Sequence, residues 1–203
     1  MSHRPRRLRT TPALRELVAE TRLHPAQLIQ PHFVHAEDAE TPIASMPGIA
    51  RLDVPRLVDR VGADLDLGLA SVLLFGVTEG GDPAASAATD PEGLVPTAVR
   101  ALKQAYGERL VVMTDVCLCG ATDHGHCGIL EDGKVLNDES LPLLVAMALA
   151  HAEAGADVVA PSDMLDLRID AIHEALEDEG FHETALMAYS SKFASAFYGP
   201  FRD

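Results

Sequence analysis

The feature that most constrains the fold is a repeated alternation between short apolar runs and longer segments of helical periodicity. Several runs are apolar at successive positions, which is typical of parallel strands covered on both faces. The segments between them place apolar residues three or four positions apart, as amphipathic helices do. The pattern predicts strands at residues 28–34, 71–77, 110–116, 156–161 and 185–190, and helices at residues 55–65, 94–106, 141–154 and 169–179.

A strand followed by a helix, repeated along the chain, predicts βα units joined by right-handed crossovers. Two α/β architectures fit this pattern, an open doubly wound sheet and a (β/α)8 TIM barrel. No GxGxxG motif follows the first predicted strand, which argues against the dinucleotide-binding form of the first. Polar residues such as Asp115, Ser162 and Asp163 follow the strands, where barrels carry their chemistry. We therefore expect the barrel family.

The number of predicted strands is too small for a closed barrel. A barrel needs eight strands and about 250 residues, whereas the 203 residues of this chain contain about five βα units. An open arc would leave unpaired edges and an uncovered interior. We expect residues 26–203 to form an incomplete barrel domain that continues in a longer chain or is completed by another chain.

The charge distribution restricts the class of partner. A net charge of −15 repels nucleic acid and anionic membranes, so neither is an expected partner. The exception is an N-terminal arm, residues 1–25, whose first nine residues include four arginines. This arm could bind nucleic acid or cross onto the acidic surface of a neighbouring subunit, and the overall charge favours the second.

Export and membrane insertion are not predicted. No apolar run approaches the roughly 18–20 residues of a membrane span. The basic start is not followed by the apolar core of a signal peptide. The expected location is cytoplasmic.

Three cysteines, Cys117, Cys119 and Cys127, lie within eleven residues together with His124 and His126. An odd, clustered set in a chain without an export signal indicates metal-binding or reactive thiols. On an extended segment the first two would face the same side, and a glycine-bearing loop could return the third. Three thiolates suit zinc and leave a fourth position for water or substrate. A histidine could be a fourth ligand or an outer donor, and the alternative is ordinary buried cysteines.

Lys192 is the candidate nucleophile. It follows an apolar strand and lies among aromatic residues. Such surroundings disfavour the ammonium form, and a neutral amine can form a Schiff base with a carbonyl. The alternative is a solvated lysine at the end of a strand. The other lysines, Lys103 and Lys134, are predicted to be ordinary surface residues.

Four further residues are candidates with structural alternatives. Arg202 could pair with a substrate carboxylate or lie on the surface. Ser162 and Asp163 could orient substrate or transfer protons, or they could cap the next helix. Asp115 ends the third predicted strand beside the cysteines, where it could act as a base or as a turn residue.

The chain resembles the porphobilinogen synthases (5-aminolevulinate dehydratases). The motifs TDVCLC, HGHCGI, AGADVVAPSDM and SKFASAFYGPFRD occur in the order and spacing of that family, and RPRRLR, SMPGI and LFGV also resemble it. The resemblance covers roughly the first three-fifths of a family member. It implies a TIM barrel with an arm that embraces a neighbouring subunit, usually in a homo-octamer.

The resemblance implies a lyase of haem and tetrapyrrole biosynthesis, which condenses two 5-aminolevulinate molecules to porphobilinogen with loss of two waters. It implies that Cys117, Cys119 and Cys127 bind a catalytic Zn2+, which polarises a carbonyl or an amine. A further Mg2+ site is left open. Lys192 matches the first of two Schiff-base lysines. The remaining matches are pocket residues Asp115, Ser162 and Asp163, wall residues Tyr198 and Phe201, and the carboxylate contact Arg202.

Several departures accompany these matches. The family's second lysine lies beyond Asp203, so the 203-residue chain alone is expected to be poorly active. The chain also departs from the family pattern at Ala121, Asp123, Leu167 and Ala188. These departures favour the alternative of a non-catalytic, zinc-binding relative that assembles with a full-length partner. A class I aldolase would also use a lysine, but it needs no metal, so the cysteines argue against it.

Overall fold

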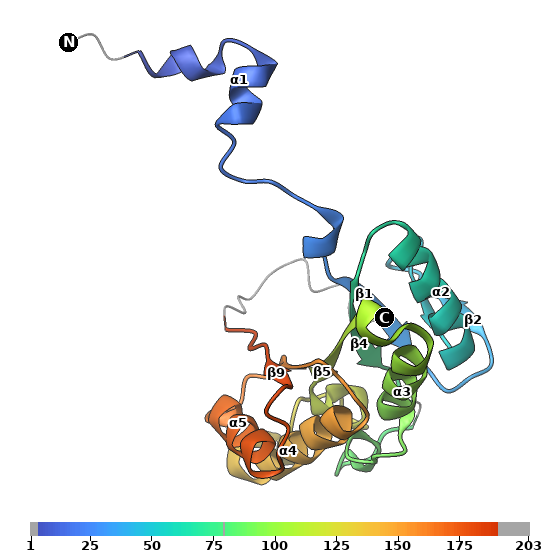
Figure 1. Ribbon diagram of the computed structural model, residues 1–203. Coiled ribbons are helices and arrows are strands. Elements are labelled where there is room, and N and C mark those ends of the chain that lie inside the picture. The colour runs from blue at the N-terminus through green and yellow to red at the C-terminus, as the bar shows by residue number, and fades with distance from the viewer. Residues whose placement is uncertain (1–3, 79, 191–203) are drawn as a thin grey trace.

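A mostly parallel sheet runs through the body of the protein, and the strands that correspond to the five predicted ones lie side by side in chain order (Figure 1). The computed structural model describes residues 4–78 and 80–190. All five predicted strands are confirmed, each within or near its expected range. They are β1 (Gln30–Val34), β4 (Ser71–Gly76), β5 (Val111–Val116), β8 (Val158–Pro161) and β9 (Ala185–Leu186).

The four predicted helices are also confirmed. They follow the strands and pack against one another along the sheet, α2 on α3, α3 on α4 and α4 on α5. The largest shift is at the third of them, α4, which begins four residues earlier than its apolar pattern because its first turn is polar. The helices are α2 (Val54–Asp66), α3 (Leu94–Tyr106), α4 (Asn137–Glu153) and α5 (Arg168–Asp178).

The register of the strands separates two faces of the sheet. Leu74 pairs with His32 on one side and with Thr114 on the other. Residues in this row face the helices and are buried, whereas their neighbours Phe33 and Phe75 face the opposite side and are partly exposed. A sheet with helices on one face and strands in chain order is the arrangement of a (β/α)8 barrel wall, not of a doubly wound sheet.

The expected arc of five strands was wrong at one edge, because β1 is not an edge strand. Strand β3 (Ala50–Leu52) pairs in parallel with β1, and β2 (Glu40–Pro42) pairs antiparallel with β3. Within the described residues the main sheet therefore has seven strands. A separate hairpin joins β6 (Ile129–Glu131) to β7 (Lys134–Leu136). These strands are three residues long, too short to show a periodic pattern.

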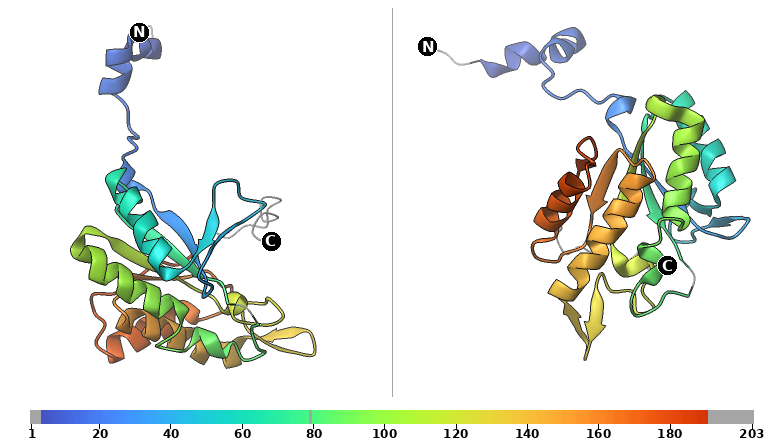
Figure 2. Two further views of the ribbon diagram at one scale, coloured as in Figure 1. Left: turned by 90° about the vertical axis from the view of Figure 1, so that its right-hand side faces the viewer. Right: turned by 60° about the horizontal axis from the view of Figure 1, so that its bottom comes forward.

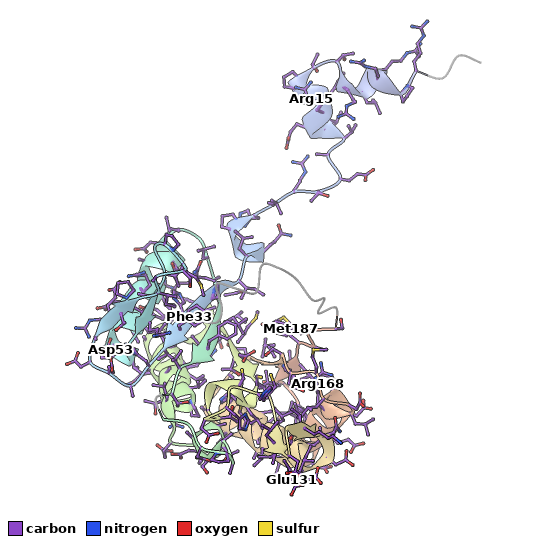
Figure 3. All side chains as sticks on the ribbon, turned by 180° about the vertical axis from the view of Figure 1, so that it is seen from behind. Arg15, Phe33, Asp53, Glu131, Arg168 and Met187 are labelled. Carbon is purple, nitrogen blue, oxygen red and sulfur yellow. The ribbon has the colours of Figure 1, made fainter. Side chains whose placement is uncertain are left out.

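The N-terminal residues from Arg4 to Gln27 project away from the body (Figure 2). They contain two 3-10 turns, η1 (Pro5–Arg9) and η2 (Pro25–Gln27), and the short helix α1 (Pro12–Leu17), none of which has a buried residue. In Figure 3, Arg15 of this segment and Glu131 of the β6–β7 hairpin lie at opposite ends of the molecule. In the described part of the chain, no helix combines the length and apolarity needed to cross a membrane.

An ion pair connects the amino-terminal ends of β5 and β8, which are the ends farther from the predicted site. Lys103 Nζ lies 2.9 Å and 3.0 Å from the two carboxylate oxygens of Asp157. The same carboxylate accepts the Val112 N–H at 2.7 Å. The pair therefore ties α3 to the beginnings of β5 and β8, and this structural role agrees with the prediction that Lys103 is not a nucleophile.

His151 gives the fold a sensitivity to acid. Its imidazole, on the sheet side of α4, is 1% exposed, and burial lowers its pKa from 6.5 to about 4. Between these values the unfolded chain binds a proton that the folded chain excludes, so stability is complete above pH 6.5 and falls as the pH drops toward 4. We expect a loss of about 2 kcal/mol from this group between about pH 7 and pH 5.

Urea unfolding at the two pH values, compared with the variant His151→Gln, measures this contribution. The variant should lose the pH dependence that His151 supplies. His182→Gln is the matched control, because His182 is exposed beside Glu177. Equal pH dependence in the unchanged protein and in His151→Gln would contradict the prediction.

Candidate metal centre and adjoining cavity

The structure brings the three cysteine sulfurs together. The Sγ atoms of Cys117, Cys119 and Cys127 all lie within 4.8 Å of one another, and the first two are 3.3 Å apart. Cys117 directly follows β5 and has an extended backbone, but Leu118–Gly120 forms the 3-10 turn η5. The first two sulfurs therefore meet through a turn and not on one extended segment as predicted.

Close backbone contacts hold the turn that carries Cys119. Thr78 donates its hydroxyl to the Gly120 carbonyl, and the Asp82 N–H donates to the Ala121 carbonyl at 3.1 Å. A Cβ at Gly81 would lie 2.5 Å from the same Ala121 oxygen, so no larger residue fits there. The loop after β4 thus fixes the position of the turn that carries Cys119.

The buried hydroxyl of Ser140 holds the segment that follows Cys127. Ser140 Oγ on α4 accepts the Ile129 N–H at 2.9 Å and donates to the Leu136 carbonyl. A Cβ at Gly128 would lie 2.6 Å from this Oγ, so glycine permits the approach directly after Cys127. Backbone contacts near Cys119 and directly after Cys127 therefore hold both ends of the intervening loop, and this brings Cys127 close to the end of β5.

The two histidines of the loop lie outside the sulfur cluster. His124 Nδ1 accepts the His126 N–H at 3.1 Å, and the two rings are 5.5 Å apart. Among the described residues, the group of ligand atoms within 4.8 Å of one another contains only the three sulfurs. This geometry favours an outer role for the histidines over that of a fourth ligand.

The thiols hold their protons unless a cation replaces them. Hydrogen bonds to Cys119 and Cys127, together with burial, raise the pKa of Cys117 strongly. The bond with Cys117 lowers the pKa of Cys119, but its contact with Cys127, burial and nearby negative charge outweigh that effect and raise it to about 11. A bound metal would stabilise the thiolates, so binding should release protons.

The two carboxylates predicted from the sequence, Asp115 and Asp163, differ in whether they face the cavity. Asp115, at the end of β5, lines the cavity beside the cysteines. Asp163 is fully buried, where its Oδ1 accepts the Leu165 N–H at 2.8 Å and lies 3.2 Å from Arg168 Nε. Burial raises the pKa of Asp163, although the Leu165 bond and the Arg168 charge lower it. Ser162 N–H donates to the Val116 carbonyl, and neither Ser162 nor Asp163 lines the cavity.

Four predicted site residues, Lys192, Tyr198, Phe201 and Arg202, lie outside the described residues. The structure adds Tyr189, which the sequence did not single out. It follows β9, its N–H donates to the Pro161 carbonyl at 3.3 Å, and burial together with the charge of Asp115 raises its pKa to about 12. Its place near the carboxyl end of the fifth predicted strand, residues 185–190, was the signal that could have identified it.

A cavity of about 520 Å3 adjoins the cysteine cluster at the carboxyl ends of the strands. Cys117, Cys119 and Asp115 form one part of its wall. Phe33 and Phe75 form another, with ring centroids 5.4 Å apart. The arrangement places three potential metal ligands beside a mostly apolar space for a small molecule, which is typical of ligand sites.

The departures from the family pattern have different structural settings. Ala121 is buried against the loop after β4, whereas Asp123 and Ala188 are exposed. Leu167 precedes α5 with a φ of 65°, in the left-handed region that favours glycine, and its side chain is exposed. The chain thus places a bulky residue where the backbone disfavours one.

Comparison with known proteins agrees with this geometry. A family model for delta-aminolevulinic acid dehydratase matches residues 2–203. The delta-aminolevulinic acid dehydratase of Methanothermobacter thermautotrophicus is 53% identical over 98% of this chain and 61% of that protein. The Bacillus subtilis enzyme is 46% identical over 99% of this chain and 62% of that protein. The chain therefore spans about three-fifths of the length of the curated relatives it matches.

A solved structure is similar over the whole chain. It is the delta-aminolevulinic acid dehydratase (porphobilinogen synthase) of Toxoplasma gondii in complex with its reaction product, porphobilinogen. It matches with a TM-score of 0.95 and 41% identity, covering 100% of this chain and 58% of that one. The predicted barrel family is confirmed by this likeness.

Replacing Leu167 should stabilise the protein. Leu167→Gly removes the left-handed strain, which outweighs the entropy that glycine adds to the unfolded chain, for a gain of about 0.5–1 kcal/mol. Leu167→Ala keeps the strain and should give no gain. Thermal and urea unfolding of the three proteins measure the difference. An equal gain in Leu167→Ala would attribute the effect to the exposed apolar side chain instead of the backbone.

Proposed function

We propose, because this chain belongs to the delta-aminolevulinic acid dehydratase family, that it takes part in condensing two 5-aminolevulinate molecules to porphobilinogen with loss of two waters. The observation that carries the proposal is the cluster of three thiols beside a small-molecule cavity at the carboxyl ends of barrel strands. A metal and an amine nucleophile in such a place suit carbonyl condensation.

The donor set supports zinc as the metal. Three thiolates are soft ligands, and sulfurs bound to zinc at about 2.3 Å lie about 3.8 Å apart in a tetrahedron. The three Sγ atoms, within 4.8 Å of one another and 3.3 Å apart at the closest, require only small movements to reach that spacing. When bound, the metal would act as a Lewis acid on a substrate oxygen or amine.

Lys192 is the proposed nucleophile. Its neutral amine would attack the ketone carbon of 5-aminolevulinate, forming a C–N bond while the ketone oxygen leaves as water. Asp115, on the cavity wall, would accept a proton from the substrate amine as the second molecule adds. The fully buried Asp163 would act from outside the cavity by fixing the loop after β8.

We propose that residues 1–25 form an arm that contacts another copy of the chain. Its apolar side chains support this role, because Leu17 is 75% exposed and Leu23 is 84% exposed. Exposure of these side chains to water is unfavourable, and packing them against a neighbouring subunit would stabilise the assembly. The family resemblance favours an octamer as the assembly.

A second candidate function is a non-catalytic, zinc-binding subunit that assembles with a full-length partner. The observation that favours it is Leu167, which strains the backbone between Asp163 and α5. The two candidates differ in whether Lys192 reacts with substrate, since both retain the metal site.

The metal proposal predicts one zinc ion per chain. Cys119→Ser should weaken zinc binding by about 100-fold or more, because even outer contacts of metal sites contribute 10- to 100-fold. Affinity should rise with pH across the neutral range, since protons compete for thiols whose pKa is raised. Competition with a fluorescent chelator measures both effects. His173→Ala, at an exposed position on α5, is the control, and unchanged affinity in Cys119→Ser would contradict the site.

The lysine proposal predicts a trapped adduct. Borohydride reduction in the presence of zinc and 5-aminolevulinate should reduce the imine and attach one substrate to the peptide that contains Lys192. Peptide mass spectrometry locates it. Lys192→Arg should remove the adduct, and Lys134→Arg, on the exposed β7 strand, should keep it. No adduct in the unchanged chain would favour the non-catalytic candidate.

A further inference from the structure

The cavity beside the cysteine cluster continues around the carboxyl ends of the strands onto the helix-covered face of the sheet. Phe33 and Phe75 line it on the open face, whereas other lining residues belong to α3, to α4 and to the 3-10 turn η3 (Ser86–Ala88) in the loop after β4. This second part, the helix-side compartment, is lined by Ala87, Ala88, Leu94, Val95, Pro96, Met147 and His151.

His151 gives the helix-side compartment a single polar side chain among its described lining residues. It follows Met147 by four positions, so both side chains lie on the same face of α4. The imidazole is 1% exposed, and its Nδ1 has no hydrogen-bond partner in the part of the chain that the structure describes. Burial of an unpaired polar atom is unfavourable, so a ligand that pairs with this imidazole would be stabilised there.

The chemistry of the compartment favours an uncharged ligand. Burial lowers the pKa of His151 to about 4, so the imidazole is neutral at pH 7 and has one hydrogen-bond donor and one acceptor. The other lining residues are apolar, and a charged group would lose its hydration there without gaining a counterion. A buried water usually makes about three hydrogen bonds, whereas apolar cavities take up small aromatic molecules.

We propose that the helix-side compartment binds a small, uncharged molecule with an apolar body and one hydroxyl group, such as a phenol. The hydroxyl pairs with His151, and the apolar body packs against Val95 and Met147. This site goes beyond the proposed function, because it lies on the other face of the sheet from the wall that faces the barrel interior.

Backbone hydrogen bonds connect the compartment to the turn that carries Cys119. The Ala88 N–H donates to the Ala85 carbonyl at 2.9 Å, and the Ala85 N–H donates to the Asp82 carbonyl at 3.1 Å. The Asp82 N–H donates in turn to the Ala121 carbonyl. A ligand packed against Ala88 would restrict this loop and hold Cys119 near the other thiols. It should therefore raise the affinity for zinc, and zinc should raise the affinity for the ligand by the same factor.

The test compares para-fluorophenol with para-fluorotoluene, which has the same ring but no hydroxyl group. Fluorine NMR titration of the zinc-loaded chain measures both affinities. We expect the unchanged chain to bind the phenol about 3- to 10-fold more tightly, as one neutral hydrogen bond provides. His151→Phe should bind the two compounds equally, and His151→Gln should recover part of the preference. Met147→Trp should fill the compartment and abolish the binding of both.

His173→Phe is the matched control, because His173 is exposed on α5, and it should keep the preference. Circular dichroism melting verifies that each variant is folded, and His151→Gln supplies a readout if His151→Phe is not. Equal affinity of the unchanged chain for the two compounds, or no binding of either, would overturn the site. Binding that survives in Met147→Trp would place the ligand elsewhere and also overturn it.

The link to the cysteine cluster has its own measurement. Competition with a fluorescent chelator gives the zinc affinity of the unchanged chain with and without saturating para-fluorophenol. We expect the ligand to raise this affinity about 5-fold or more. His151→Phe should show a smaller increase at the same phenol concentration, because it binds the phenol less tightly. An unchanged zinc affinity would overturn the link between the compartment and Cys119.

Discussion

The register between parallel strands is the constraint on which the site depends. Apolar residues such as Val72, Leu74 and Val112 are fully buried against the helices, and this burial fixes which residues of each strand face inward. A shift of one residue between β4 and β5 would turn Asp115 toward the helices and expose Val116. The hydrophobic contacts on one face of the sheet therefore determine the chemistry of the other face, although they touch none of the reactive groups.

The geometry of the cysteine cluster depends on a second feature, the close backbone contacts that small residues allow. Gly76, Gly81, Gly120 and Gly128 lie at points where a side chain would collide with a neighbouring atom. Their absence of side chains lets three loops pack at the end of β5, where a larger residue would separate them. The hydroxyls of Thr78 and Ser140 then bind the backbone of those loops. The positions of the three thiols are thus set by residues outside the sulfur cluster.

Much of the architecture could be predicted because periodic burial leaves a pattern in the sequence. Strands β1, β4 and β5 and the helices of the barrel wall are long enough to show it, whereas β2, β3, β6 and β7 have three residues each and do not. The cysteines were identified from their spacing alone. The place of Arg51 in the cavity wall was not predicted, because it depends on β3 pairing with β1, a contact between distant segments that no local pattern encodes. Tyr189 was missed in the same way, because its proximity to Asp115 depends on three strands lying side by side.

The ion pair between Lys103 and Asp157 makes the two ends of the strands differ in how well they should tolerate substitutions. It fastens the beginnings of β5 and β8, at the opposite ends of the strands from the cysteines and Asp115. Substitutions at the rim that carries the metal loop can therefore alter ligand selectivity without loosening the strands beneath it. Evolution, or an engineer, can vary one rim for chemistry while the other preserves the scaffold, and the barrel wall behaves as a reusable base for new reactions.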